Sequence, residues 1–205
     1  MSYQIIGDSC MDRTPEMYRD SLHFKTVPLS IEVGGQIIID DDSFDQMAFH
    51  AMMKESPLCP KSACPSPEAF LRAYEESPAK DLYVLTISEK LSGSCNAARL
   101  GRELYLEAHG DSEKNIAVFS TDTATAGQTL LALMCRDLCE KGFDFQEVCS
   151  RMEDHIRKMK IFFVLEDLSA LRKNGRLSSA AAFFANALNI KPVLCAEHGE
   201  IFARS

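Results

Sequence analysis

Three short apolar runs in this chain each end in a small polar turn, and a helical pattern follows each turn. The runs Tyr3–Gly7, Leu82–Thr86 and Ile116–Phe119 are typical of buried strands. Strands that alternate with helices favour an α/β fold, in which helices flank a mostly parallel sheet. We therefore expect the carboxyl ends of these strands to lie at one edge of the sheet, where ligands of such folds bind.

The polar turns carry the groups that could bind a ligand. They are Asp8–Ser9, Ser88–Ser94 and Ser120–Thr123, and we expect them to converge on one site. A helix begins near Ser94, and a helix N-terminus carries about +0.5 of an elementary charge and unpaired N–H groups. Such an end suits a carboxylate or a phosphate. The alternative is that Ser92 or Ser94 only caps the helix.

Residues 30–65 interrupt the parallel pattern. Gly34-Gly35 lies between two short strand-like runs and predicts a β-hairpin. Ser43 and Gln46 have the spacing of a capping box, which predicts a helix over 44–55. The proline-rich residues 56–65 are expected to form a loop.

Composition and spacing argue against several classes of protein. The net charge of −8 over 205 residues disfavours nucleic acid as a partner. No apolar run approaches the ~20 residues of a membrane span, and no signal peptide is evident. We therefore expect a cytoplasmic protein without stable membrane insertion. The eight cysteines and Asp40–Asp42 lack the spacing of metal ligands, and no nucleotide-binding motif is present, so no metal or cofactor is expected.

The pattern changes after about residue 156. Residues 157–205 hold eight Lys and Arg against four Asp and Glu, whereas the preceding part is acidic. Their sequence predicts short strands over 160–165, 190–196 and 200–204, a short helix over 168–174 and an apolar helix over 178–188. We predict that residues 1–156 form an α/β domain that carries the binding site. Residues 157–205 would form the first, incomplete part of a second α/β domain.

The residues leave the function open between binding and catalysis. A hydroxyl-rich edge that faces an apolar helix suits a ligand with a small anionic head and a large apolar body. No nucleophile elbow surrounds Ser92, and no His has an evident partner in the sequence. A hydrolase or a small phosphotransferase that uses the same edge remains the alternative.

Four motifs, in order along the chain, resemble those of the DegV family of bacterial fatty-acid-binding proteins. Ile87–Ser94 resembles the S-S-x-L-S-G-T loop, and Lys61–Pro67 resembles K-T-S-Q-P-S-P. Asp8-Ser9 follows the first strand, as in the family. Leu168–Arg176 resembles L-x-x-L-x-x-G-G-R, and Ile190–Pro192 resembles the I-K-P strand after it. The resemblance spans nearly the whole chain.

The resemblance implies two α/β domains with a long-chain fatty acid, such as palmitate, buried between them. By position, hydroxyls of the Lys61–Pro67 and Ile87–Ser94 motifs would hold its carboxylate, with help from N–H groups at the start of the helix that follows Ser94. Together with the first strand-end turn, the candidate ligand contacts are Ser62, Ser92, Gly93, Ser94, Asp8 and Ser9.

The resemblance also implies a carrier and not an enzyme, one that presents the acyl chain to a separate fatty acid kinase. Arg172, Lys173 and Arg176 would form a docking surface for that kinase; a solvated helix face is the other interpretation. Three residues depart from the family pattern, since Ala63 replaces a Ser, Cys64 replaces a Gln and Asn174 replaces the first Gly of G-G-R. The family pattern continues beyond the equivalent of residue 205, so the second domain is expected to be incomplete here.

Overall fold

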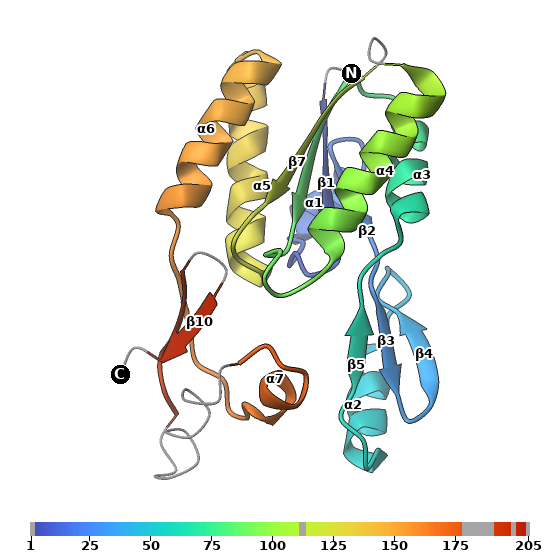
Figure 1. The fold of residues 1–205 in the computed structure, drawn as a ribbon, viewed down its shortest axis with the longest axis vertical. Helices are drawn as coiled ribbons and strands as arrows, with labels where there is room; N and C mark the ends of the chain where they lie inside the picture. The colour runs from blue at the N-terminus through green and yellow to red at the C-terminus, as the bar shows by residue number, and fades with distance from the viewer. Residues whose placement is uncertain (1–2, 111–113, 178–190, 198–199, 204–205) are drawn as a thin grey trace.

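A four-stranded parallel sheet forms the centre of the molecule (Figure 1). The computed structural model describes residues 3–110, 114–177, 191–197 and 200–203. The strands β1 (Tyr3–Asp8), β2 (Phe24–Val27), β6 (Asp81–Thr86) and β7 (Asn115–Ser120) lie in the order β2-β1-β6-β7, with every neighbouring pair parallel. The expected α/β fold with a mostly parallel sheet is therefore confirmed.

Helices cover both faces of this sheet, because successive strand residues point to opposite sides. On one face, Ile5, Tyr83 and Leu85 pack against α5 (Thr125–Glu140) and α6 (Phe145–Lys158). On the other face, alternate residues of the same strands pack against two further helices, α3 (Pro67–Glu76) and α4 (Ser94–His109). Burial on both faces holds the strands, and so the turns at their ends, in fixed positions.

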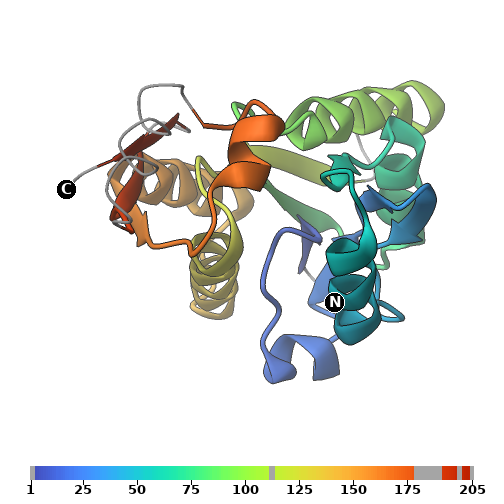
Figure 2. The same ribbon diagram turned by 90° about the horizontal axis from the view of Figure 1, so that it is seen from below.

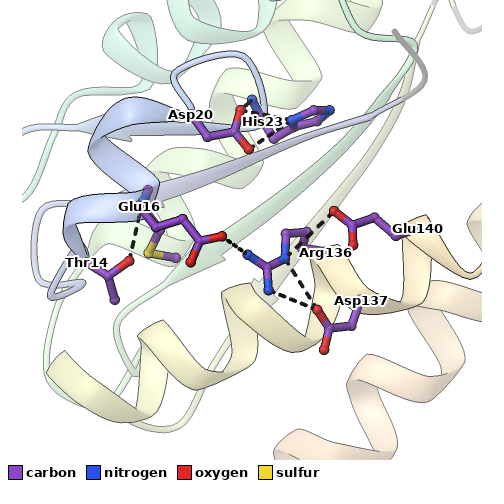
Figure 3. Close-up of polar contacts among 8 residues, drawn as sticks. Thr14, Glu16, Asp20, His23, Arg136, Asp137 and Glu140 are labelled. Atoms are coloured by element: carbon purple, nitrogen blue, oxygen red, sulfur yellow. Dashed lines mark hydrogen bonds and ion pairs between the residues drawn. The ribbon is translucent and has the colours of Figure 1, made fainter.

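The short helix α1 (Pro15–Arg19) is tied to α5 by an ion-pair cluster (Figure 3). Arg136 on α5 lies with one guanidinium nitrogen 3.0 Å from Glu16 and another 3.1 Å from Asp137. Thr14 caps α1 by accepting a hydrogen bond from the N–H of Met17. These contacts hold the chain that leaves β1, and with it the first of the polar turns.

A small antiparallel sheet, in the order β4-β3-β5, extends from one end of the parallel sheet. The predicted hairpin is present as β3 (Ser30–Val33) and β4 (Gln36–Ile39), with Gly34 and Gly35 both at positive φ. The prediction of a loop over 56–65 is wrong at β5 (Lys61–Ala63), which pairs with β3. This strand is three residues long and is stabilised by a distant partner, so no local pattern marks it.

The capping box predicted at Ser43 is also wrong. The helix α2 (Gln46–Glu55) begins two residues later than expected, and Asp45 caps it by accepting from the N–H of Ala48. The Ser43 hydroxyl instead donates to the carboxylate of Asp41, two residues earlier in the chain, at 2.6 Å. A local side-chain hydrogen bond thus competes successfully with the helix start.

The last part of the chain forms a second antiparallel sheet, in the order β10-β9-β8. It consists of β8 (Ile161–Phe163), β9 (Leu194–Glu197) and β10 (Glu200–Ala203), and the expected hairpin is the β9–β10 pair. The short helix α7 (Ser169–Lys173) lies between this sheet and the β3–β5 sheet (Figure 2). The apolar helix expected over 178–188 lies outside the described residues, and the domain boundary at 156 stays a prediction. No helix within the described ranges has the length and apolar character that crossing a membrane requires.

Candidate functional site

The three polar turns lie together at the carboxyl edge of the parallel sheet, as their positions in the sequence lead us to expect. The N–H of Ser88 donates to the carbonyl of Thr123 at 3.0 Å. The N–H of Ile87 donates to the carboxylate of Asp8 at 2.9 Å. Residues from three separate strand ends therefore form one hydrogen-bonded platform.

A cavity of about 630 Å³ lies between this platform, β5 and described residues of β8, α7 and the β9–β10 pair, such as Ile161, Leu171 and Ile201. Its volume is typical of a site for a small organic ligand. One group of wall residues is polar, namely Ser62, Ser92, Thr123, Thr125, Asn174 and Arg176. A larger group is apolar and includes Leu29, Ile87, Leu91, Ile161, Phe163, Leu165, Leu171 and Ile201. The wall thus combines a few hydrogen-bonding groups with an extended apolar surface.

The N-terminus of α4 forms part of the polar wall. Gly93 is its N-cap residue and provides no side-chain cap. The Ser92 hydroxyl accepts from the N–H of Ser94 at 3.3 Å, so Ser92 contributes to helix capping while it also faces the cavity. A side chain at position 93 would meet Cys64, since an added Cβ would lie 3.1 Å from its sulfur. The close approach of Cys64, the residue after β5, to the start of α4 therefore favours glycine at this position.

Arg176 supplies a positive charge to the same wall. It follows Gly175, whose φ of +71° ends α7 and turns the chain back toward the sheet edge. The guanidinium donates from Nε to the carbonyl of Leu91 at 3.3 Å and from Nη1 to that of Asn174 at 2.9 Å. Among the described wall residues, Arg176 alone carries a charged side chain.

The match to a family model covers residues 2–203, and the model describes an uncharacterised protein of the DegV family. The chain belongs to the DegV family. A DegV domain-containing protein of Streptococcus pneumoniae (strain ATCC BAA-255 / R6) is 38% identical over 197 residues, which are 94% of this chain and 68% of that protein. A DegV domain-containing protein of Streptococcus pyogenes serotype M1 is 36% identical, again over 68% of its length.

Solved structures of DegV proteins have the same fold. A Ruminococcus gnavus protein refined with vaccenic acid superposes with a TM-score of 0.92 at 41% identity, covering 100% of this chain and 72% of its own. The Streptococcus pneumoniae Fatty Acid Kinase (Fak) B3 protein, loaded with linoleic acid, gives 0.89 at 35% identity with the same coverage. A fatty-acid-binding DegV protein of Thermus thermophilus gives 0.85 at 30% identity, covering 100% of this chain and 71% of that one.

The structure of this DegV family member divides the six candidate ligand contacts into two groups. Ser62, Ser92 and Gly93 line the cavity. Asp8, Ser9 and Ser94 lie outside its wall: Asp8 and Ser94 are fully buried, and the Ser9 hydroxyl accepts from the N–H of Leu29 at 3.0 Å. Direct contact of Asp8, Ser9 and Ser94 with a ligand stays a prediction. The hydrogen bonds of Asp8 with Ile87 and of Ser9 with Leu29 hold two residues of the cavity wall in place.

The three candidate docking residues also have different surroundings in the structure. Arg172 and Lys173 are exposed on α7, whereas Arg176 lies in the cavity wall. The sequence placed Arg176 with its basic neighbours because all three lie within five residues. The glycine between Lys173 and Arg176 was the available signal that the chain reverses there.

Two further features of the site were missed in the sequence. Gln128 on α5 is fully buried and donates to Asp8 at 3.0 Å and to the carbonyl of Leu85 at 2.8 Å. Thr125 in the cavity wall has a φ of +50°, which is strained for a β-branched residue. A hydrogen bond from its N–H to the carbonyl of Cys10, 2.9 Å long, holds it there. A polar residue within the apolar pattern of α5 was the one sequence signal for Gln128.

Proposed function

We propose that this protein binds a long-chain fatty acid, such as palmitate, in the 630 Å³ cavity. The observation that carries the proposal is a cavity whose wall combines hydroxyl-bearing residues and Arg176 with apolar side chains over most of its surface. The fatty acids in the solved structures of the Ruminococcus gnavus and Streptococcus pneumoniae relatives support the same ligand class.

In this proposal the carboxylate lies near Ser62, Ser92 and Arg176. A charge-assisted hydrogen bond from a guanidinium is stronger than one from a hydroxyl, so Arg176 would contribute most to holding the head group. The acyl chain would lie against the apolar wall, which includes Ile161 and Phe163. Burial contributes about 0.8 kcal/mol for each CH₂, so the chain supplies most of the affinity and the head sets the orientation.

We propose further that the protein is a carrier and that residues 1–156 and 157–205 lie on either side of the ligand. The described wall residues offer hydroxyls, thiols, one side-chain amide and one guanidinium, and none of them is a His, Asp or Glu that could act as a general base. This favours a carrier over the hydrolase or phosphotransferase alternative. The Streptococcus pneumoniae relative is named a fatty acid kinase protein, which supports a fatty acid kinase as partner. Arg172 and Lys173, exposed beside the cavity, would contact that kinase.

Extraction of the native protein tests this proposal. Protein purified without detergent is denatured and extracted with organic solvent, and the extract is examined by mass spectrometry. We expect a near-stoichiometric fatty acid, and we expect delipidated protein to take up added palmitate. Absence of an acyl species together with no uptake of palmitate would contradict the proposal. Turnover of an ester or a phosphoryl substrate, lost in Ser92→Ala, would favour the enzyme instead.

A further inference from the structure

The two hydroxyl groups that are proposed to hold the ligand belong to separate parts of the fold. Ser62 lies on β5, which pairs with β3 in the small antiparallel sheet. Ser92 lies in the loop before α4, and α4 packs on the parallel sheet. Donors to one carboxylate must be held within about 0.5 Å of a productive geometry. The separation of Ser62 and Ser92 therefore depends on contacts that join these two parts.

The side chain of Asn174 makes one such contact. Its Nδ2 donates to the carbonyl oxygen of Pro60 at 3.1 Å and to that of Ala170 at 3.0 Å. Pro60 directly precedes β5, and Ala170 lies on α7. Both acceptors are carbonyl oxygens, so the nitrogen of the amide has to face them. Asn174 therefore joins the end of α7 to the start of the strand that carries Ser62.

Arg176 continues this connection to the loop that carries Ser92. Its Nη1 donates to the backbone carbonyl of Asn174 at 2.9 Å, and its Nε donates to that of Leu91 at 3.3 Å. Leu91 directly precedes Ser92 in the sequence. A series of hydrogen bonds thus runs from Pro60 through Asn174 and Arg176 to Leu91. It links the two segments that carry the hydroxyl groups.

Asn174 lies in the cavity wall, yet its amide protons are not available to a ligand. A side-chain amide has two protons to donate, and the two carbonyl oxygens accept both. Arg176 differs, because a guanidinium has five N–H groups and only two of them donate to described residues. Arg176 can therefore also donate to a bound carboxylate, whereas Asn174 acts on the ligand through the residues that it holds.

We propose that Asn174 is a positioning residue: it holds Ser62 where that hydroxyl and the guanidinium of Arg176 can donate to the same carboxylate. The inference rests on the proposed function, since it requires a carboxylate ligand at this wall. Without the Asn174 side chain, β5 keeps its pairing with β3 but loses this link to α7. Ser62 should then contribute little to binding, although its hydroxyl is still present.

The alternative role of Asn174 is to cap the C-terminal end of α7. Its side chain and its own N–H both donate to the carbonyl oxygen of Ala170, each at 3.0 Å. If capping were its whole contribution, its removal would disturb α7 and with it Arg176, and Ser62 would keep its effect on binding. The dependence of the Ser62 contribution on Asn174 therefore separates the two roles.

A double-mutant cycle in the delipidated full chain tests the proposal. The Kd of palmitate is measured by displacement of a fluorescent fatty acid. Ser62→Ala should raise this Kd roughly two- to tenfold in the wild type, and Asn174→Ala should raise it by a similar factor. In the Asn174→Ala background, Ser62→Ala should add less than about twofold. An equal effect of Ser62→Ala in both backgrounds would overturn the inference but not the proposed function, whereas failure of the wild type to bind palmitate would overturn the proposed function.

Ser92→Ala is the matched control for this cycle. Ser92 lies at the other end of the connection from Pro60, so Ser92→Ala should raise the Kd by the same factor with and without Asn174→Ala. Ser169→Ala removes a side-chain hydrogen bond at the opposite end of α7 and should leave the Ser62 contribution intact. Asn174→Gly, which restores the residue of the family pattern, provides the same cycle if Asn174→Ala does not fold. Equal loss of the Ser62 and Ser92 contributions in the Asn174 variant would refute a specific placement of Ser62.

Discussion

Arg176 and Leu91 lie 85 residues apart in the chain, yet the Nε of Arg176 donates to the carbonyl oxygen of Leu91 at 3.3 Å. This contact joins the segment after α7 to the loop before α4, and it places the guanidinium beside Ser92 in the cavity wall. The positive charge is thereby brought to the hydroxyl-rich end of the cavity.

Arg176→Gln should weaken fatty acid binding. The variant loses a charge-assisted hydrogen bond, which contributes about 1.5–3 kcal/mol, so Kd should rise by roughly tenfold or more. Displacement of a fluorescent fatty acid measures the change. Arg172→Gln, on the exposed face of α7, is the matched control and should keep the wild-type Kd. Equal loss in the two variants would show that the effect is one of general charge.

Ser62→Ala and Ser92→Ala should each weaken binding modestly. A neutral hydrogen bond contributes about 0.5–1.5 kcal/mol, which corresponds to a rise in Kd of roughly two- to tenfold. Neither hydroxyl belongs to the hydrophobic core, so the melting temperature should change little. Equal fatty acid content of the purified wild type and the double variant would contradict the head-group assignment.

Gly101→Ala should destabilise the fold without touching the cavity. An added Cβ would lie 2.7 Å from the carbonyl oxygen of Pro67 and 2.9 Å from Cβ of Phe70, where α4 packs against α3. Backbone atoms cannot move aside easily, so overpacking should cost about 1–3 kcal/mol of unfolding free energy. Urea unfolding measures the loss. Leu100→Ala, at a residue 41% exposed on the same helix, should cost far less.

Asp8 should make stability depend on pH. Its pKa is raised in the folded state by burial, so the folded protein binds a proton more tightly than the unfolded chain does. The unfolding free energy should therefore fall as the pH rises from the ordinary Asp pKa through the raised one. Urea unfolding of the wild type at a series of pH values from 4 upward tests this. Asp8→Asn should lack this component, and an identical pH profile in the variant would contradict it.

The sequence alone predicted the framework of this protein well. The apolar runs of β1, β6 and β7 and the helical patterns between them determine a parallel α/β sheet, because both faces of each strand must be buried. The polar turns at the strand ends then had to meet at one edge. The family motifs at 61–67 and 87–94 pointed to the hydroxyl groups that line the cavity, and the Gly34-Gly35 turn predicted the hairpin.

Tertiary structure decided which of the candidate residues face the cavity. Ser92 and Ser94 are two residues apart and chemically identical, but the turn into α4 places Ser92 in the cavity wall and buries Ser94. Arg176 reaches the site by a contact across 85 residues, and β5 exists only because β3 is available to pair with it. Long-range contacts of this kind depend on how the elements pack, and the spacing of residues along the chain does not contain that information.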